Sequence, residues 1–240
     1  MRTFNAKGLV LKETLVGEAD KILTVLLKER GKVSVSAKGA RKTGSKFLFA
    51  SQVFCYCDYV IYTGGKYYSI ASAQFIDNFY GISSDYDKLC IGAYLLELTD
   101  KVIMENQDCD DILYLLLKTL KTLEKGTHCP ELIRCAYELK FLQLNGYSPE
   151  VSVCADCGSA VNENIFFNHF GLICQDCAQG SASQISPGCL HAVRYILSQE
   201  INKLFSFTIN EKTLSELKNI TKGLFDMHMG VKLKSAQFIG

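Results

Sequence analysis

Two Cys-x-x-Cys pairs constrain this chain more than any other feature of its sequence. Cys154 and Cys157 form the first pair, Cys174 and Cys177 form the second, and 16 residues separate them. This spacing lets two tight turns bring four thiolates to one tetrahedral zinc ion. Because a Cys₄ site leaves no open position for a substrate or an activated water, the pattern predicts one structural Zn²⁺.

The residues around the pairs suggest what this site is for. Residues 165–173 are expected to form a short hairpin, which makes 151–180 a zinc ribbon. The alternative is two redox-active dithiols, but the flanking sequence lacks the strand-to-helix setting they require. No lysine or arginine occurs from Phe141 to Val193. Since nucleic-acid binding needs cations to neutralise phosphates, we expect a scaffold or a protein contact.

The rest of the chain has an ordinary globular composition, with 48% hydrophobic and 21% charged residues among 240. No run of 18 apolar residues appears, so no membrane-spanning helix is expected. The N-terminus lacks the pattern of a signal peptide. The seven other cysteines are scattered through apolar segments, as expected for buried thiols in a reducing cytoplasm.

Charge divides the chain into four segments despite a net charge of only +1. Residues 1–80 carry +6, residues 81–150 carry −5, residues 151–180 carry −3 and residues 181–240 carry +3. A basic N-terminal segment suggests a polyanion-binding module. We therefore expect a nucleic-acid-binding domain, a first helical part, the ribbon insertion and a second helical part, with these boundaries.

The periodicity of apolar residues predicts an α+β fold. Alternating patterns near 4–12, 21–27, 33–37, 53–62 and 67–75 indicate five strands, which suit a small OB-fold barrel. Beyond residue 84, apolar residues recur at helical spacing. The expected architecture is thus an N-terminal five-stranded OB-fold barrel, followed by an α-helical body with an inserted Cys₄ zinc ribbon.

A basic connection lies between the third and fourth predicted strands, and no acidic residue occurs between Glu29 and Asp58. Cations and glycines in such a loop can follow a phosphate backbone. The predicted DNA contacts are Lys7, Lys32, Lys38, Arg41, Lys42 and Lys46, and the candidates for stacking on bases are Phe47, Phe49, Tyr67 and Tyr68. The structural alternatives are that the basic connection is an ordinary solvated loop and that the aromatic side chains belong to the core.

Two further observations concern partners and catalysis. Lys118, Lys121 and Lys125 share one face of a predicted helix in the acidic segment, so they are candidates to bind an acidic partner, although such faces usually serve solubility. The four histidines (His128, His169, His191 and His228) lie in no catalytic motif, and no phosphate-binding Gly-x-x-x-x-Gly-Lys sequence occurs. We therefore expect a protein that is not an enzyme.

Several motifs together resemble the bacterial recombination mediator family RecO. They are Lys-Gly-Leu-Val-Leu-Lys at 7–12, Gly-Glu-Ala-Asp-Lys-Ile at 17–22, Ala-Lys-Gly-Ala-Arg-Lys at 37–42, Glu-Leu-Lys-Phe-Leu at 138–142, Gly-Tyr-Ser-Pro-Glu at 146–150 and Gly-Val-Lys-Leu-Lys-Ser at 230–235. The resemblance implies a non-catalytic, nucleoid-associated DNA repair protein that binds single- and double-stranded DNA and anneals complementary strands.

The same resemblance implies partners that the residues alone do not identify. They are RecR, the acidic C-terminal tail of the single-strand-binding protein SSB and, indirectly, the recombinase RecA. The alternative is a transcription or translation factor that combines an OB-fold with a zinc ribbon and binds RNA or polymerase. That alternative predicts a cationic ribbon or a defined RNA target, and the cation-free stretch argues against the first.

Overall fold

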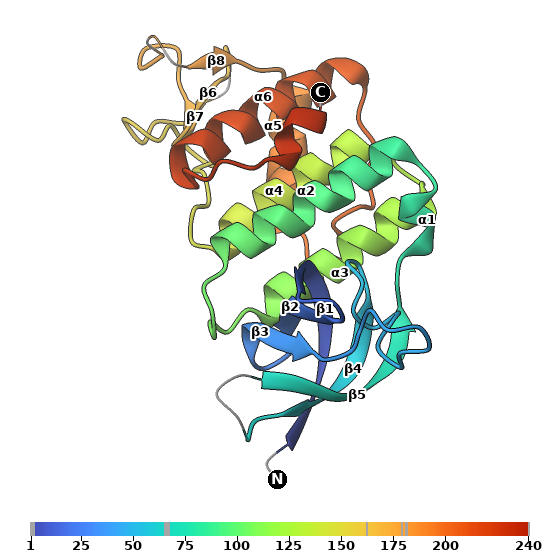
Figure 1. Cartoon of the computed structure of the whole chain (residues 1–240). Helices are drawn as coiled ribbons and strands as arrows, with labels where there is room; N and C mark the ends of the chain where they lie inside the picture. Colours follow the sequence, from blue (N-terminus) through green and yellow to red (C-terminus); the bar gives the residue numbers. More distant parts are fainter. Residues whose placement is uncertain (1–2, 65–67, 162, 179, 181, 240) are drawn as a thin grey trace. The chain divides into compact units, whose positions relative to one another are not determined.

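The computed structural model describes residues 3–64, 68–161, 163–178, 180 and 182–239 (Figure 1). The chain forms two compact units, Met1–Glu124 with Leu233–Gly240, and Lys125–Lys232. The first unit contains a β-barrel and the helices that follow it. The second contains further helices and a small three-stranded sheet.

Five strands close the predicted barrel. They are β1 (Thr3–Val16), β2 (Asp20–Leu27), β3 (Gly31–Ala37), β4 (Tyr56–Tyr62) and β5 (Tyr68–Asp77), in the order β1-β2-β3-β5-β4. Neighbours are antiparallel except β3 and β5, whose short parallel pairing closes the barrel. The strand expected to begin at residue 53 begins at Tyr56, because Phe54 has a φ of 70°, which is incompatible with extended backbone.

The barrel interior is filled by alternating side chains. On β3, Val33 and Val35 are buried whereas Ser34 between them is exposed, as the period of two requires. Gly31 begins β3 with a φ of 71°, and a Cβ there would overlap the carbonyl oxygen of Gln107. Only glycine therefore fits this position without moving the backbone.

Three helices follow the barrel: α1 (Tyr80–Ser83), α2 (Tyr86–Val102) and α3 (Asp110–Lys125). The carboxylate of Asp85 caps α2 by accepting a hydrogen bond from the backbone N–H of Lys88 (3.1 Å). The C-terminal segment returns to α2, where the Glu97 carboxylate accepts the backbone N–H of Lys234 and of Ser235 (3.0 and 2.8 Å). These bonds attach the short helix η2 (Ser235–Phe238) to the first unit.

The second unit contains α4 (Pro130–Leu144), α5 (Pro187–Ser198), η1 (Ile201–Lys203), α6 (Glu211–His228) and a sheet of β6 (Phe166–Asn168), β7 (Gly171–Ile173) and β8 (Ser183–Gln184). The sheet order is β7-β6-β8, and β6 with β7 forms the predicted hairpin. The buried Lys140 ammonium donates to the carbonyl oxygens of Leu197 and Gln199 (3.1 and 2.7 Å). This side chain thereby joins α4 to the end of α5.

No helix in the described part of the chain combines the length and the apolar character needed to cross a membrane.

Candidate nucleic-acid surface and metal centre

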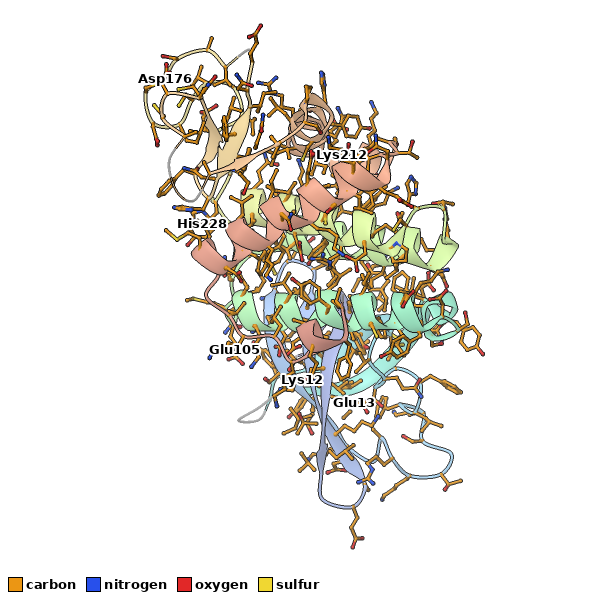
Figure 2. The ribbon with its side chains drawn as sticks, turned by 90° about the horizontal axis from the view of Figure 1, so that it is seen from above. Lys12, Glu13, Glu105, Asp176, Lys212 and His228 are labelled. Atoms are coloured by element: carbon orange, nitrogen blue, oxygen red, sulfur yellow. The ribbon has the colours of Figure 1, made fainter. Side chains whose placement is uncertain are left out.

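The basic loop, residues 38–46, follows β3 and lies against the β1–β2 turn. Arg41 donates its backbone N–H to the carbonyl oxygen of Ala19 (2.9 Å) and its Nη1–H to that of Gly17 (3.1 Å). The Asp20 carboxylate accepts a further backbone N–H of the loop (2.7 Å). Figure 2 shows the pale-blue β1–β2 hairpin running out to this turn. The loop is therefore held in place rather than free in solvent.

Three cations of the basic loop are exposed: Lys38, Arg41 and Lys42. None of them forms an ion pair with another residue that the structure describes. Lys46 is also exposed, but its ammonium donates to the carbonyl oxygen of Ala71 (3.2 Å) and lies 4.9 Å from the centre of the Phe47 ring. The loop thus presents three charges that the described residues do not neutralise.

The two remaining predicted cations lie on strands. Lys7 is exposed on β1, opposite Asp58 of β4. Lys32 on β3 donates to the backbone carbonyl of Asp100, and its ammonium is 3.6 Å from the carboxylate of the same residue. Only 13% of the Lys32 side chain is exposed. Lys32 therefore connects the barrel to α2, and its ammonium already has an acidic partner.

The predicted stacking aromatics have different environments. Phe47 is buried in the barrel core, whereas the Phe49 side chain is 68% exposed. Tyr68 packs edge-on against Phe4, with ring centres 5.8 Å apart, and Tyr67 lies outside the described residues. Of the three described aromatics, Phe49 is therefore the one whose ring is open to a ligand.

The end of the β1–β2 hairpin has a feature that the sequence reasoning missed. Leu15, Val16 and Ile22 are large apolar residues, each at least 40% exposed. A signal was present in the sequence, since Leu15 and Val16 are adjacent and must point to opposite faces of a strand, where one face should be polar. These side chains flank the turn to which the basic loop is hydrogen-bonded.

The four predicted metal ligands come together. The Sγ atoms of Cys154, Cys157, Cys174 and Cys177 all lie within 4.8 Å of one another, and those of Cys157 and Cys174 are 3.7 Å apart. With Zn–S bonds of about 2.3 Å, neighbouring sulfurs of a tetrahedral site are ~3.8 Å apart. The four thiols therefore fit one four-coordinate metal ion.

Backbone groups around the first pair favour the thiolate form. Desolvation raises the pKa of Cys154, but the backbone N–H groups of Cys157, Cys174 and Asp156 outweigh it and lower that pKa to about 6. The N–H of Cys174 lies 3.3 Å from the Cys154 sulfur. All eleven cysteines are free thiols, so none of the four predicted metal ligands forms a disulfide.

The ribbon is closed by backbone hydrogen bonds between residues far apart in sequence. Glu150 donates its backbone N–H to the carbonyl oxygen of Phe170 and accepts the N–H of Leu172 (2.9 and 2.8 Å). Between them Gly171 has a φ of 135°, and a Cβ there would overlap the Glu150 backbone. Residues 151–180 contain acidic residues, such as Asp176 (Figure 2), and no lysine or arginine.

The predicted lysine stripe lies on α3, with Lys121 and Lys125 exposed and Lys118 half-buried. Lys121 forms ion pairs with Asp77 (2.8 Å) and Glu124 (2.7 Å), which raise the pKa of Lys121. Part of the charge of this stripe is therefore neutralised within the first unit.

Comparison with known proteins agrees with this architecture. Residues 1–79 match the model of "Recombination protein O N terminal", and residues 83–237 match that of "Recombination protein O C terminal". The chain is 35% identical over 226 residues to "DNA repair protein RecO" of Acetivibrio thermocellus, covering 92% of this chain and 90% of the relative. It is 31% identical over 242 residues to the protein of that name from Thermoanaerobacter sp. strain X514, covering 100% of this chain and 98% of the relative.

Proposed function

The chain belongs to the RecO family of DNA repair proteins, and from this premise we propose that it is a non-catalytic recombination mediator. In this role it binds single- and double-stranded DNA, anneals complementary strands and helps to load RecA onto DNA coated with SSB. The observation that carries the proposal is the basic loop, which is hydrogen-bonded to the β1–β2 turn and presents three exposed cations that form no ion pair with any residue the structure describes.

DNA binding through this loop is sequence-independent. Phosphates attract the three cations, and the release of counterions supplies most of the free energy of binding. Lys7 and Lys46 belong to the same barrel and extend the proposed contact. We leave Lys32 out of it, because its ammonium is bonded to Asp100. A nucleoid-associated, cytoplasmic location follows from this substrate.

The other segments have supporting roles in this proposal. The four cysteines hold one structural Zn²⁺, which stabilises residues 151–180, a segment too small to bury a core of its own. The thiolates saturate the metal, so no water is activated there. Residues 81–150 and 181–240 provide helical surfaces for protein partners.

We infer those partners from family membership. They are RecR, the acidic tail of SSB and, indirectly, RecA. For the tail, Lys118 and Lys125 are the stronger candidates within the stripe, because Lys121 is already paired with Asp77 and Glu124. The tail's carboxylates would pair with these ammonium groups.

A strand-annealing assay with and without SSB tests the proposal. Complementary labelled strands should pair faster with the full chain than without it, both naked and coated with SSB. The variant Lys38→Ala/Arg41→Ala/Lys42→Ala should lose this acceleration. Lys101→Ala/Lys212→Ala/Lys222→Ala removes the same charge from exposed sites outside the loop and should retain it. Failure to accelerate naked strands would reject the function, and failure on SSB-coated strands alone would reject the mediator role.

A further inference from the structure

An open groove lies beside the first cysteine pair, within the second unit. Three segments line it: residues 148–150, residues 153–156 with Gly158, and Phe170 in the turn between β6 and β7. Cys154, one of the four predicted metal ligands, is among the lining residues. The groove is therefore part of the ribbon and of the segment that leads into it.

Backbone hydrogen bonds connect the segments that line the groove. Glu150 donates its N–H to the carbonyl oxygen of Phe170 (2.9 Å) and accepts the N–H of Leu172 (2.8 Å). Ala155 donates its N–H to the carbonyl oxygen of Leu172 (2.8 Å). Because these bonds fix the groove before a ligand arrives, little conformational entropy is lost on binding.

The groove offers an apolar surface that includes an aromatic ring. Phe170 is 53% exposed and Val153 is 36% exposed. The ring of His169 lies against that of Phe170, with ring centres 4.4 Å apart. An exposed aromatic face of this kind attracts a cation, because the ring carries negative charge above its plane.

The charged groups of the groove are acidic. Glu150 and Asp156 are exposed, and neither forms an ion pair with another residue that the structure describes. No lysine or arginine occurs from residue 141 to residue 193. Four thiolates also exceed the charge of one Zn²⁺, so an occupied metal site adds negative charge beside the groove. The groove thus complements a cationic ligand and repels nucleic acid and acidic peptides.

We propose that this groove binds a basic segment of a partner protein, whose arginine side chain stacks on Phe170 and pairs with Glu150 and Asp156. Arginine suits the groove better than lysine, because its flat guanidinium can stack on a ring and bind carboxylates at the same time. The inference concerns a surface of the second unit and does not rest on DNA binding by the basic loop.

The probe is a short fluorophore-labelled peptide in which arginine alternates with leucine. In two comparison peptides every arginine is replaced, by lysine in one and by glutamate in the other. Fluorescence anisotropy measures binding of each peptide to the full chain.

Two variants remove the two components of the groove. Phe170→Leu removes the ring and keeps an apolar side chain, and Glu150→Gln/Asp156→Asn removes the charges and keeps the side-chain shapes. The control, Glu163→Gln/Asp176→Asn, removes two exposed acidic groups of the same ribbon that do not line the groove. Asp176, labelled in Figure 2, has the same position in the second cysteine pair as Asp156 has in the first. Thermal unfolding and zinc content establish that the variants fold like the parent.

The parent should bind the arginine peptide about threefold more tightly than the lysine peptide and should not bind the glutamate peptide. Phe170→Leu should abolish the preference for arginine. Glu150→Gln/Asp156→Asn should weaken binding of the arginine peptide about fivefold at about 0.1 M salt, and the control should keep the parental affinity.

Three results would overturn the proposal: no binding of the arginine peptide by the parent, equal affinity for arginine and lysine peptides, or equal losses in the groove variant and the control. Self-association of the parent that Phe170→Leu abolishes, with no peptide binding, would assign the groove to a second copy of the chain instead. Strand annealing should be the same in all of these variants, so the proposal can fail while the proposed function stands.

Discussion

Removing the basic-loop charges that form no ion pair with the described residues should change the salt dependence of DNA binding in a calculable way. The perturbation is Lys38→Ala/Arg41→Ala/Lys42→Ala. The structure selects these three because Lys32 is paired with Asp100 and the Lys46 ammonium is bonded to a carbonyl oxygen. The loop's backbone bond from Arg41 to the β1–β2 turn survives the substitutions, so the barrel should fold normally.

The magnitude follows from counterion release. Each phosphate contact with a single strand contributes about 0.7 to the slope of log K against log salt concentration, so three lost contacts make the slope shallower by about 2. Affinities of variant and parent should converge near 1 M salt, where electrostatic binding vanishes. One decade lower, at 0.1 M, the variant should therefore bind roughly 100-fold more weakly.

Anisotropy titrations of a labelled homopolymeric strand at several salt concentrations measure both quantities. Lys101→Ala/Lys212→Ala/Lys222→Ala, which changes the net charge equally, should keep the parental slope. Weaker binding with an unchanged slope would refute the reasoning, because it would mean that no phosphate contact had been lost. An unchanged affinity would show that the phosphate contacts lie outside the loop.

Three further predictions concern the ribbon and the lysine stripe. Cys174→Ser should lower the zinc content of freshly purified protein below one ion per chain, and elemental analysis showing equal zinc in variant and parent would contradict the Cys₄ site. Gly171→Ala should destabilise the ribbon by about 2–4 kcal/mol because it combines a positive φ with a backbone overlap. Gly158 has a φ of 73° and open space at the Cβ, so Gly158→Ala should lower the free energy of unfolding by only about 1 kcal/mol. Equal losses for the two variants in denaturant unfolding would contradict the argument from backbone overlap. Lys118→Glu should weaken binding of an SSB tail peptide in calorimetric titrations and leave DNA affinity nearly intact; equal peptide affinities would exclude this lysine.

Features that depend on local pattern could be predicted from the amino-acid sequence. The spacing of the cysteine pairs predicted four thiols within reach of one ion, because each Cys-x-x-Cys turn brings its own two sulfurs together and the hairpin expected between the pairs brings the two turns together. The alternation of residues 1–80 likewise predicted five strands and a closed barrel. The family motifs occur in order along nearly the whole chain, so they indicate the family without knowledge of the fold.

Which of these residues are available to a ligand depends on contacts made by the folded chain. Lys32 and Lys38 look alike in the sequence, yet the side chain of the first is largely covered and paired with Asp100, whereas the second is exposed. A single residue separates Phe47 from Phe49, yet Phe47 is buried and Phe49 is exposed. Pairing and burial depend on residues brought together by folding, sometimes from far along the chain, and no local pattern encodes those neighbours.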